Sequence, residues 1–499
     1  METFSIPTPT AAERLALPVV QAGAVAVVLV ALLNAAFDLD RFLVPKELAL
    51  HVTAVLVGLL AFRAIRRTIG GRIDLMIVIY LLLSALSAVM ATNRWLGIRA
   101  LAVSASGIVL LWIARGLKDA GLSRPLLNAL ALAVVIASVT SLLQAYGLRI
   151  DLFALNRSPG GTLGNRNFVA HVAAFGLPLL FYVALSGRFV LGSFGVAIVT
   201  ASLVLTRSRA AWLATAVMLL IFIVSARMWR RLAGVLVFAV VGAAAALVIP
   251  NTLHWRGANP YLQSVTGVAN YEEGSGRGRL VQYTRSLIMA ATHPIFGVGP
   301  GNWPVKYPRY SLRNDPSVDS DRMTFNPWPS SDWIAFVSER GPVAAVLMAL
   351  IFIGIALAGS RHENRLLKAT LLAMLAAAIV EGMFDAVLLL AAPTLIVWTA
   401  IGALWPVEQR PALGGWRLAI PLFVIGIAAV GAFRSASQIV AMEMYVTGGR
   451  ASLVRAAQID PGNYRIQLRL AQRCEHARAA HALFPEAAEA AALARHCGR

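Results

Sequence analysis

The stretch LAGVLVFAVVGAAAALVIP, from Leu232 to Pro250, contains no charged side chain and decides the class of fold. A helix of about twenty such residues is long enough to cross the hydrocarbon core of a bilayer. The next residue, Asn251, begins a polar segment that runs to Pro329. The chain therefore places a predicted membrane span directly before a long polar insert, and long loops in compact proteins usually carry function.

Similar apolar stretches recur on both sides of the insert. Before it they lie near residues 17–37, 48–65, 75–91, 98–114, 127–147, 168–186, 189–206 and 210–226, and after it near 333–359, 366–390, 392–406 and 416–433. The chain is 58% hydrophobic and 14% charged, whereas soluble domains carry roughly 25% charged residues. We therefore expect an all-α polytopic integral membrane protein with about 12–13 transmembrane helices. The first stretch has no small-residue cleavage site after it, so it is predicted to be a retained helix.

Four regions follow from this pattern. A first transmembrane bundle of about nine helices is expected over residues 1–250, and a large outward-facing loop over 251–332. A second bundle of about four helices is expected over 333–433, followed by a small helical tail over 434–499.

Basic residues concentrate in alternate short loops. They follow the second, fourth, eighth and tenth stretches: Arg63, Arg66, Arg67, Arg72, Arg115, Lys118, Arg124, Arg227, Arg230, Arg231, Arg361, Arg365 and Lys368. Loops rich in Lys and Arg normally stay in the cytoplasm. The N-terminus is therefore predicted to be cytoplasmic, with the insert and the tail on the opposite side.

Further arginines lie on the predicted outward side, where basic residues are normally reduced. They are Arg157, Arg166, Arg207, Arg209, Arg256, Arg277, Arg279 and Arg285. A guanidinium group binds phosphate oxygens through two parallel hydrogen bonds and stays charged. The cluster favours a pyrophosphate at the membrane surface, and anchoring to lipid headgroups is the alternative. The net charge of +20 does not indicate nucleic acid, because cytoplasmic loops account for much of the excess.

The tail has a different, more polar helical pattern. AAQIDPGNYRIQLRLAQRC, from Ala456 to Cys474, predicts the end of a helix, an Asp-Pro-Gly-Asn turn and a new helix, and it resembles a degenerate tetratricopeptide-type hairpin. Both cysteines, Cys474 and Cys497, lie in this tail. Because the tail is predicted to face an oxidising compartment, we expect them to form a disulfide between two helices that meet near Phe484. A zinc site fits less well, since the nearby histidines lack the usual ligand spacing.

Four polar motifs border the outward loops. They are GTLGNRNFVAH (Gly161 to His171), LTRSRAAWLA (Leu205 to Ala214), GRLVQYTRSLIMAATHPIFGVGPGNW (Gly278 to Trp303) and SSDWIAFVSERG (Ser330 to Gly341). Together with the early Pro-Lys at Lys46, they resemble the O-antigen ligase and polymerase superfamily over residues 40–400.

The family typically shows a Gly-Asn-x-Asn entry, a Ser-Arg-Gly-like turn and an Arg fifteen residues before Pro-x-x-Gly-x-Gly. A His-Asn-Asp segment that leads to Glu-x-Gly then follows. The matching positions here are Asn165, Asn167, Ser208, Arg209, Arg279, Pro294, Gly297, Gly299, Asp332, Glu339 and Gly341.

The resemblance implies a glycosyltransferase of the bacterial inner membrane, with the insert and the tail in the periplasm. Such an enzyme moves a glycan from an undecaprenyl-pyrophosphate carrier to an acceptor hydroxyl of lipopolysaccharide core, a growing polysaccharide or a protein. The implied catalytic residues are Arg279, Asp332 and Glu339. The implied substrate-binding residues are Lys46, Asn165, Arg166, Asn167, Arg209, Tyr283, Gly297 and Gly299. No metal or other cofactor is expected, and no nucleic acid.

One position departs from the family pattern. Where the family commonly has the His of a His-x10-Gly pattern, counting back from Gly341 places Ser330. The resemblance implies that this His acts as a base on the acceptor hydroxyl, and a serine cannot do so unaided at neutral pH. Asp332 or Glu339 takes the role, or the alignment slips, or the protein is a catalytically altered member.

Several of these residues also have plain structural interpretations. Gly297 and Gly299 allow backbone amides to approach a phosphate, or form an ordinary turn. Arg279 and Tyr283 share one helix face, so the Arg lies over a sugar phosphate or is simply solvated. Arg209 binds substrate or extends to lipid headgroups.

Carboxylates inside a membrane span are expensive and usually have a partner. Glu381 and Asp385, four residues apart on one face, are predicted to pair with an Arg such as Arg209, or to position Lys46 or a substrate-binding Arg. His171 is predicted to be a hydrogen-bonded packing residue. His293 is predicted to cap the helix before Pro294.

Two other classes of function remain open. A lipid-linked sugar transporter or flippase would also have many spans with internal charges, although its site would lie near the midplane between repeated halves. A non-catalytic family member that binds carrier lipid is the second, because of Ser330.

Overall fold

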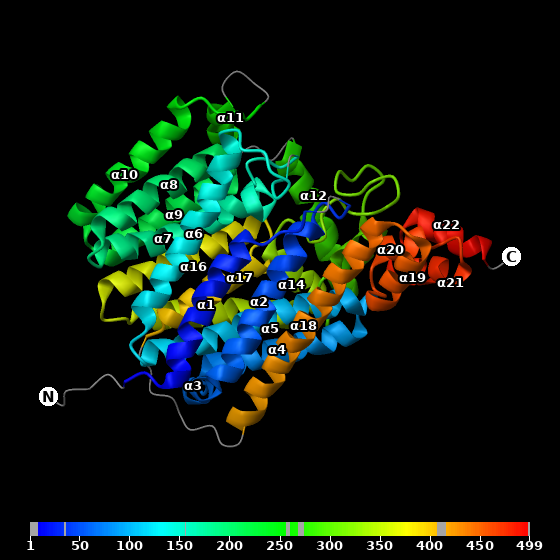
Figure 1. Cartoon of the computed structure of the whole chain (residues 1–499), viewed down its shortest axis with the longest axis horizontal. Coiled ribbons are helices and arrows are strands. Elements are labelled where there is room, and N and C mark those ends of the chain that lie inside the picture. The colour runs from blue at the N-terminus through cyan, green and yellow to red at the C-terminus, as the bar shows by residue number, and fades with distance from the viewer. Residues whose placement is uncertain are drawn as a thin grey trace.

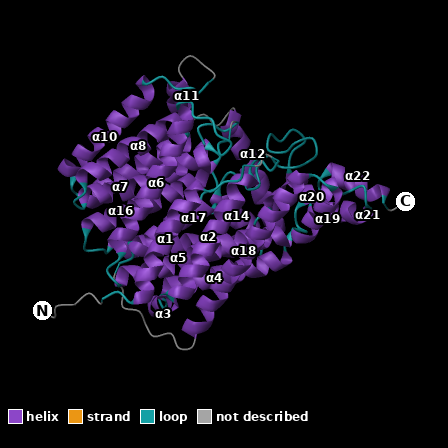
Figure 2. Cartoon of the chain, in the orientation of Figure 1, coloured by secondary structure: helices purple, strands orange, loops and turns teal. Residues whose placement is uncertain are grey.

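The computed structural model describes residues 8–33, 36–154, 156–255, 260–267, 274–406 and 416–497. Within these ranges the regular elements are helices, and the β-structure is one isolated bridge between Val318 and Thr324. Figure 2 shows helices throughout the molecule, joined by loops that gather at its two ends. The prediction of an all-α polytopic protein is confirmed.

Twelve of the described helices are long and apolar enough to cross a membrane. They are α1 (Ala11–Leu29), α2 (Asp40–Leu60), α4 (Arg72–Met90), α5 (Arg94–Asp119), α6 (Ser123–Ala145), α7 (Arg166–Leu185), α8 (Phe189–Thr206), α9 (Arg209–Ala226), α10 (Trp229–Val248), α15 (Pro342–Ser360), α16 (Arg365–Phe384) and α18 (Trp416–Thr447). A further apolar helix, α17 (Ala391–Ala403), is shorter. The predicted number of spans agrees with this set.

Three boundaries differ from the prediction. The apolar stretch 333–359 forms two helices, α14 (Asp332–Arg340) and α15, because Gly341 between them has φ 86° and its backbone lies against the carbonyl of Ile295. Helix α2 begins at Asp40, so Lys46 lies inside a helix and not in a loop. Helix α18 continues to Thr447, past the expected start of the tail at residue 434.

The helices before and after the insert form one interleaved bundle (Figure 1). Helix α16 packs on α7 and α9, α17 packs on α5, and α18 packs on α2 and α5. Helix α7 is enclosed along its whole length, and every residue of its apolar window is buried. The N-terminal end of α7 is therefore surrounded by protein, which makes it a rigid base for a site.

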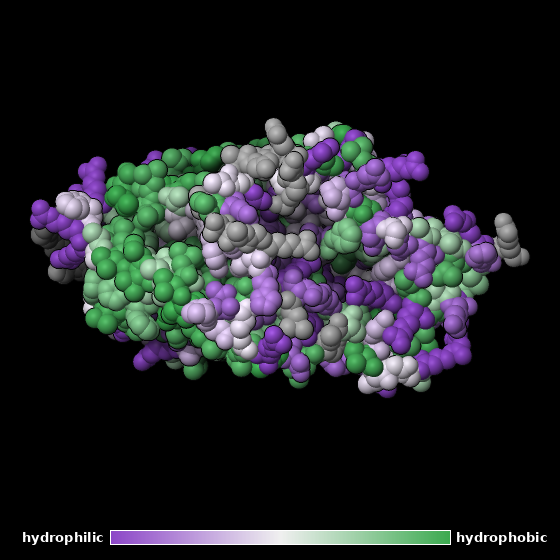
Figure 3. All heavy atoms as spheres, turned by 90° about the horizontal axis from the view of Figure 1, so that it is seen from above, coloured by the Kyte–Doolittle hydropathy of each residue, from purple (hydrophilic) through white to green (hydrophobic). Residues whose placement is uncertain are grey.

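The insert and the tail lie at the same end of this bundle. The insert contributes α11 (Pro260–Thr266), α12 (Gly274–Thr292) and α13 (Trp303–Tyr310), whereas α3 (Phe62–Thr68) lies at the opposite end (Figure 1). The carboxylate of Asp321 in the insert accepts a 2.6 Å hydrogen bond from the backbone amide of Glu489 in the tail. Seen from this end, hydrophilic side chains gather over the centre and right of the molecule (Figure 3). The assignment of this end to the periplasm stays a prediction.

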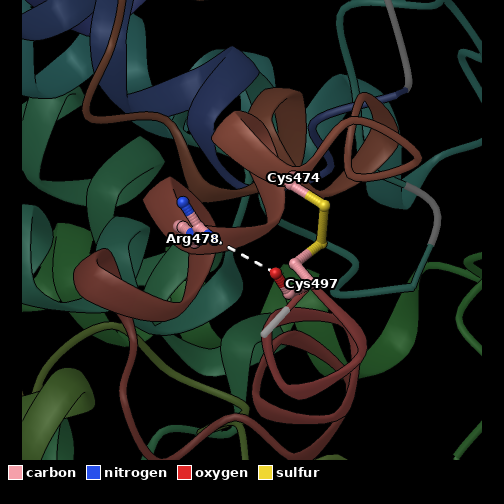
Figure 4. The surroundings of a disulfide bond; sticks show 3 residues. All are labelled: Cys474, Arg478 and Cys497. Carbon is pink, nitrogen blue, oxygen red and sulfur yellow. Dashed lines mark hydrogen bonds between the residues drawn. A yellow bond between two sulfur atoms is a disulfide. The ribbon is translucent and has the colours of Figure 1, made fainter. Parts of the chain in front are cut away.

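The tail contains α19 (Arg450–Ile459), α20 (Tyr464–Arg469), α21 (Cys474–Leu483) and α22 (Ala488–His496). The predicted turn lies between α19 and α20, where Asn463 caps α20. The structure joins Cys474 and Cys497 in a disulfide, with Cα atoms 5.4 Å apart, as the sequence predicts (Figure 4). Arg478 donates a hydrogen bond to the carbonyl of Cys497 at 3.1 Å (Figure 4). The disulfide therefore links the start of α21 to the residue that follows α22.

Candidate functional site

A large basic cavity opens at the end of the bundle that carries the insert. Its volume is about 910 Å³. Its basic and aromatic lining residues are Arg149, Phe153, Arg166, Arg207, Arg209, His254 and Trp255. None of the described lining residues is acidic. The cavity is therefore strongly positive and suits an anion.

Local backbone geometry brings two of these arginines together. Arg207 ends α8 in the left-handed conformation, with φ 55°, and Arg209 begins α9 after a single intervening residue. Arg207 donates a 3.0 Å hydrogen bond to the hydroxyl of Ser264 in α11, and Arg209 donates one to the carbonyl of Gly267. The tight turn and the contacts with α11 thus hold both guanidinium groups at the cavity.

The indole of Trp255 contacts two guanidinium groups. The Cζ atoms of Arg166 and Arg207 are 4.9 and 4.8 Å from the centre of its ring. Cation–π contacts of this kind are each worth roughly 0.5–2 kcal/mol. Burial lowers the pKa of Arg207, and the neighbouring charge of Arg209 lowers it further, against the opposing effect of Tyr261. Gathering like charges is unfavourable, and a bound anion would relieve this repulsion.

Three of the eight predicted outward arginines, Arg166, Arg207 and Arg209, line this cavity. Arg149, which the sequence analysis missed, lines it as well. Arg149 follows the apolar stretch 127–147 in a predicted outward loop, so the sequence indicates that it belongs with the other outward basic residues. Arg256 lies outside the described residues.

A second polar site forms where α14 meets the end of α16. The hydroxyl of Ser331 donates to the carbonyl of Gly382 at 2.9 Å. The carboxylate of Asp332 accepts two 2.9 Å hydrogen bonds from the amides of Val387 and Leu388. Burial raises the pKa of Asp332 to about 7, although the two amides oppose this. Residues 331–332 are therefore fastened to residues 382–388.

Tyr283 of α12 strengthens the same junction. Its hydroxyl lies 2.6 Å from the carbonyl oxygen of Ser330 and 2.8 Å from that of Met383, so its proton is shared between them. Ser330, at the position where the family has its His, thus lies close to the end of α16.

An imidazole and two carboxylates meet behind this junction. The Nε2 atom of His171 lies 3.4 Å from the carboxylate of Glu381 and 3.6 Å from that of Asp385. The side-chain amide of Asn167 donates to Asp385 at 3.1 Å. The charge of Arg279 on α12 acts on both His171 and Glu381. The expected partners of the two carboxylates were arginine or lysine, and the structure places His171 there.

The glycine motif and Glu339 form one interlocked unit. The carboxylate of Glu339 accepts hydrogen bonds from the amides of Gly301 at 2.9 Å and Trp303 at 3.3 Å. Its backbone carbonyl accepts one from the amide of Gly299 at 2.9 Å. Gly297, Gly299 and Gly301 all have positive φ angles, and a side chain on Gly297 would collide with the backbone of Glu339. The amides predicted to approach a phosphate are therefore bound to the protein itself.

Other predicted substrate-binding residues also have partners within the protein. The ammonium group of Lys46 donates to the carbonyls of Val30 at 2.5 Å and Thr162 at 2.7 Å. Asn165 caps α7, and its side-chain oxygen accepts the amide of Asn167 at 3.0 Å. Lys46 is therefore not among the residues that line the basic cavity.

A second cavity, of about 280 Å³, lies between the tail and the bundle. Its lining includes acidic, basic and aromatic side chains, among them Asp40, Glu47, Trp328, Glu339, Arg434, Asp460 and Tyr464. The ring of Phe168 lies 5.9 Å from that of Trp328. The first turn of α7 thus lies between the two cavities: Arg166 lines the first, and Phe168 contacts the wall of the second.

Fold and site together define a polytopic membrane protein with a basic cavity at one end of its bundle. Residues 194–326 match a family model described as O-Antigen ligase. The match covers α8 to α10 and most of the insert, including Arg207, Arg209, Trp255 and Arg279. It confirms the resemblance to the O-antigen ligase superfamily and indicates a glycosyltransferase-like role in polysaccharide assembly. No curated protein matches the chain.

Proposed function

We propose that this protein transfers a glycan from an undecaprenyl-pyrophosphate carrier to an acceptor hydroxyl at the periplasmic face of the bacterial inner membrane. The observation that carries the proposal is the basic cavity, which Arg149, Arg166, Arg207 and Arg209 line. A diphosphate linked to a membrane lipid has the matching charge and the matching location.

The donor binds with its diphosphate in the basic cavity. Arg166, Arg207 and Arg209 contact the phosphate oxygens, and Trp255 keeps the first two guanidinium groups in place. Hydrogen bonds to charged groups contribute roughly 1.5–3 kcal/mol each. As the glycan leaves, negative charge develops on the diphosphate, and preorganised cations stabilise that charge more strongly than the ground state.

The acceptor approaches through the second cavity, between the tail and the bundle. Aromatic faces such as Trp328, beside carboxylates such as Asp460, suit the apolar faces and hydroxyl groups of a sugar. The two cavities flank the first turn of α7, so a donor in one and an acceptor in the other would meet there.

Activity of the purified protein tests this proposal. Liposomes would contain the protein, undecaprenyl-pyrophosphate-linked oligosaccharide and candidate acceptors, and release of undecaprenyl pyrophosphate and glycan transfer would be measured. We expect Arg207→Ala and Arg166→Ala each to weaken donor binding by about tenfold or more. Arg231→Ala, an exposed arginine at the opposite end of the bundle, is the matched control and should bind normally.

The other classes of function give different results in the same system. Donor binding without transfer to any acceptor would indicate a carrier-lipid-binding family member. Movement of the donor between leaflets without transfer would indicate a flippase. No binding of undecaprenyl pyrophosphate would refute the donor site itself.

A further inference from the structure

The cluster of His171, Glu381 and Asp385 contains buried polar atoms without hydrogen bonds. Both ring nitrogens of His171 and both carboxylate oxygens of Glu381 have no hydrogen-bond partner among the described residues. His171 is 1% exposed and Glu381 is fully buried. Leaving such groups unpaired costs roughly 1–3 kcal/mol each, and more for charged groups. Ionisable residues inside a membrane protein usually serve function, because insertion selects against them.

The cluster lies next to Ser330, the position at which the family has its histidine. The hydroxyl of Tyr283 contacts the carbonyls of both Ser330 and Met383, and Met383 precedes Asp385 by two residues. Hydrogen bonds from Ser331 and to Asp332 continue this contact along residues 382–388. A proton acceptor on Asp385 would therefore serve the same region as a side chain at position 330.

Asp385 is the member of the cluster that a substrate can reach. Its side chain is 15% exposed, against 1% for His171 and 0% for Glu381. Asn167 and the amide of Ala386 each donate to a different oxygen of its carboxylate. The neighbours of Asn167 in sequence are Arg166, which lines the basic cavity, and Phe168, which contacts Trp328 of the second cavity. The carboxylate is thus oriented and partly open, and its partner Asn167 lies between one residue that lines the first cavity and one that contacts the wall of the second.

The two predicted alternatives are almost fully buried, whereas the side chain of Asp385 is 15% exposed. Asp332 is 1% exposed, and its two oxygens each accept a backbone amide. Glu339 lines the second cavity, but it is only 1% exposed, and its two carboxylate oxygens accept the amides of Gly301 and Trp303. Moving either carboxylate to a substrate would break the junction that it holds together.

We infer that Asp385 is the base that accepts the proton of the acceptor hydroxyl, with His171 and Glu381 as positioning residues behind it. This inference rests on the proposed glycan transfer. The acceptor oxygen forms a bond to the anomeric carbon of the donor while the bond from that carbon to the phosphate oxygen breaks. The diphosphate keeps the electron pair, and the acceptor proton passes to the carboxylate of Asp385. His171 can then take this proton, and Glu381 stabilises the imidazolium.

The charged and titratable groups around this cluster come from four helices. Helix α7 provides His171, α16 provides Glu381 and Asp385, α12 provides Arg279 and Tyr283, and α14 provides Asp332, which interacts with Asp385. The variants below leave Arg279, Tyr283 and Asp332 unchanged, so their contribution to the pH dependence is common to all.

The test compares binding of undecaprenyl pyrophosphate with glycan transfer in the same preparation. Removal of a general base costs typically 10²–10⁴-fold in rate, so Asp385→Asn should lose about 100-fold or more in transfer while binding changes less than about twofold. Asp119→Asn, at the opposite end of the bundle, is the matched control. Added formate should restore transfer to Asp385→Ala by about fivefold or more, which a purely structural role would not produce. His171→Gln should lower kcat and shift the pH at which transfer is half-maximal.

Each other outcome overturns the inference. Transfer by Asp385→Asn within about threefold of wild type would refute it and leave the proposed function intact. Loss of transfer without rescue by formate, together with an unshifted pH profile for His171→Gln, would assign the cluster to structure. Failure of the wild-type protein to bind undecaprenyl pyrophosphate would refute the proposed function instead. Should Asp385→Ala fail to fold, the pH profile of His171→Gln decides.

Discussion

The carboxylate of Glu339 accepts a hydrogen bond from the backbone amide of Gly301 at 2.9 Å. This contact joins two motifs that lie on either side of α13 and the loop after it. Because Gly301 has a positive φ angle and its backbone packs against Leu96 of α5, the same contact anchors the insert to the membrane bundle. The glycine motif and the Glu-x-Gly motif, which resemble family motifs, therefore have a structural role in holding the insert on the bundle.

Replacing Glu339 by glutamine should destabilise the protein. The glutamine side chain has one acceptor oxygen for two backbone amides, and an unpaired buried amide costs roughly 1–3 kcal/mol. Thermal unfolding in detergent should show a lower midpoint for Glu339→Gln, with Glu486→Gln in the tail as control. An unchanged midpoint with loss of glycan transfer would instead make Glu339 directly catalytic, as the resemblance implies.

Asp332 should make stability depend on pH. Burial raises its pKa to about 7 in the folded protein, above the ordinary value of about 3.9 in an unfolded chain. Between these values the folded state holds a proton that the unfolded state has lost. Stability should therefore fall as the pH rises from about 4 to about 7, by on the order of 1 kcal/mol per pH unit. Unfolding midpoints measured across this range should depend less on pH in Asp332→Asn, and an equal dependence would argue against this assignment.

Trp255 should contribute to donor binding through its two guanidinium neighbours. Trp255→Leu removes the ring that Arg166 and Arg207 both contact, so the two arginines lose contacts worth roughly 0.5–2 kcal/mol each. We expect binding of undecaprenyl pyrophosphate to weaken by about fivefold or more, whereas Trp255→Phe keeps an aromatic face and should bind nearly as well as wild type. Equal affinity of all three proteins would show that the ring does not organise the site.

The disulfide should stabilise the tail and leave the bundle unaffected. Closing a loop of the length between Cys474 and Cys497 contributes about 3 kcal/mol in the chain-entropy model. Reduction, or the change Cys474→Ser, should speed hydrogen exchange of α21 and α22 but not of α7 or α16. Faster exchange across α7 as well would indicate that the tail supports the bundle.

Much of the architecture was predictable because it depends on properties of short segments. The length of an apolar stretch decides whether it can span a bilayer, so the number of spans could be read directly. The break at Gly341 was missed because the apolar pattern continues across it, and the break depends on close contact with Ile295. The first two turns of α2, which contain Lys46, were not predicted to be helical. The ammonium group of Lys46 is satisfied there by the carbonyls of Val30 and Thr162, which are distant in sequence.

The candidate site likewise combines features that the sequence predicts with features that depend on tertiary packing. An excess of outward arginines is a local signal, and it predicts an anion-binding surface. The sequence alone therefore determined a polytopic helical protein with a positively charged outer end. Only the tertiary structure decided that Arg166, Arg207 and Arg209 share one cavity, and that His171 meets Glu381 and Asp385. These meetings depend on how α7, α9 and α16 pack, and packing between distant segments leaves no periodic pattern in the chain.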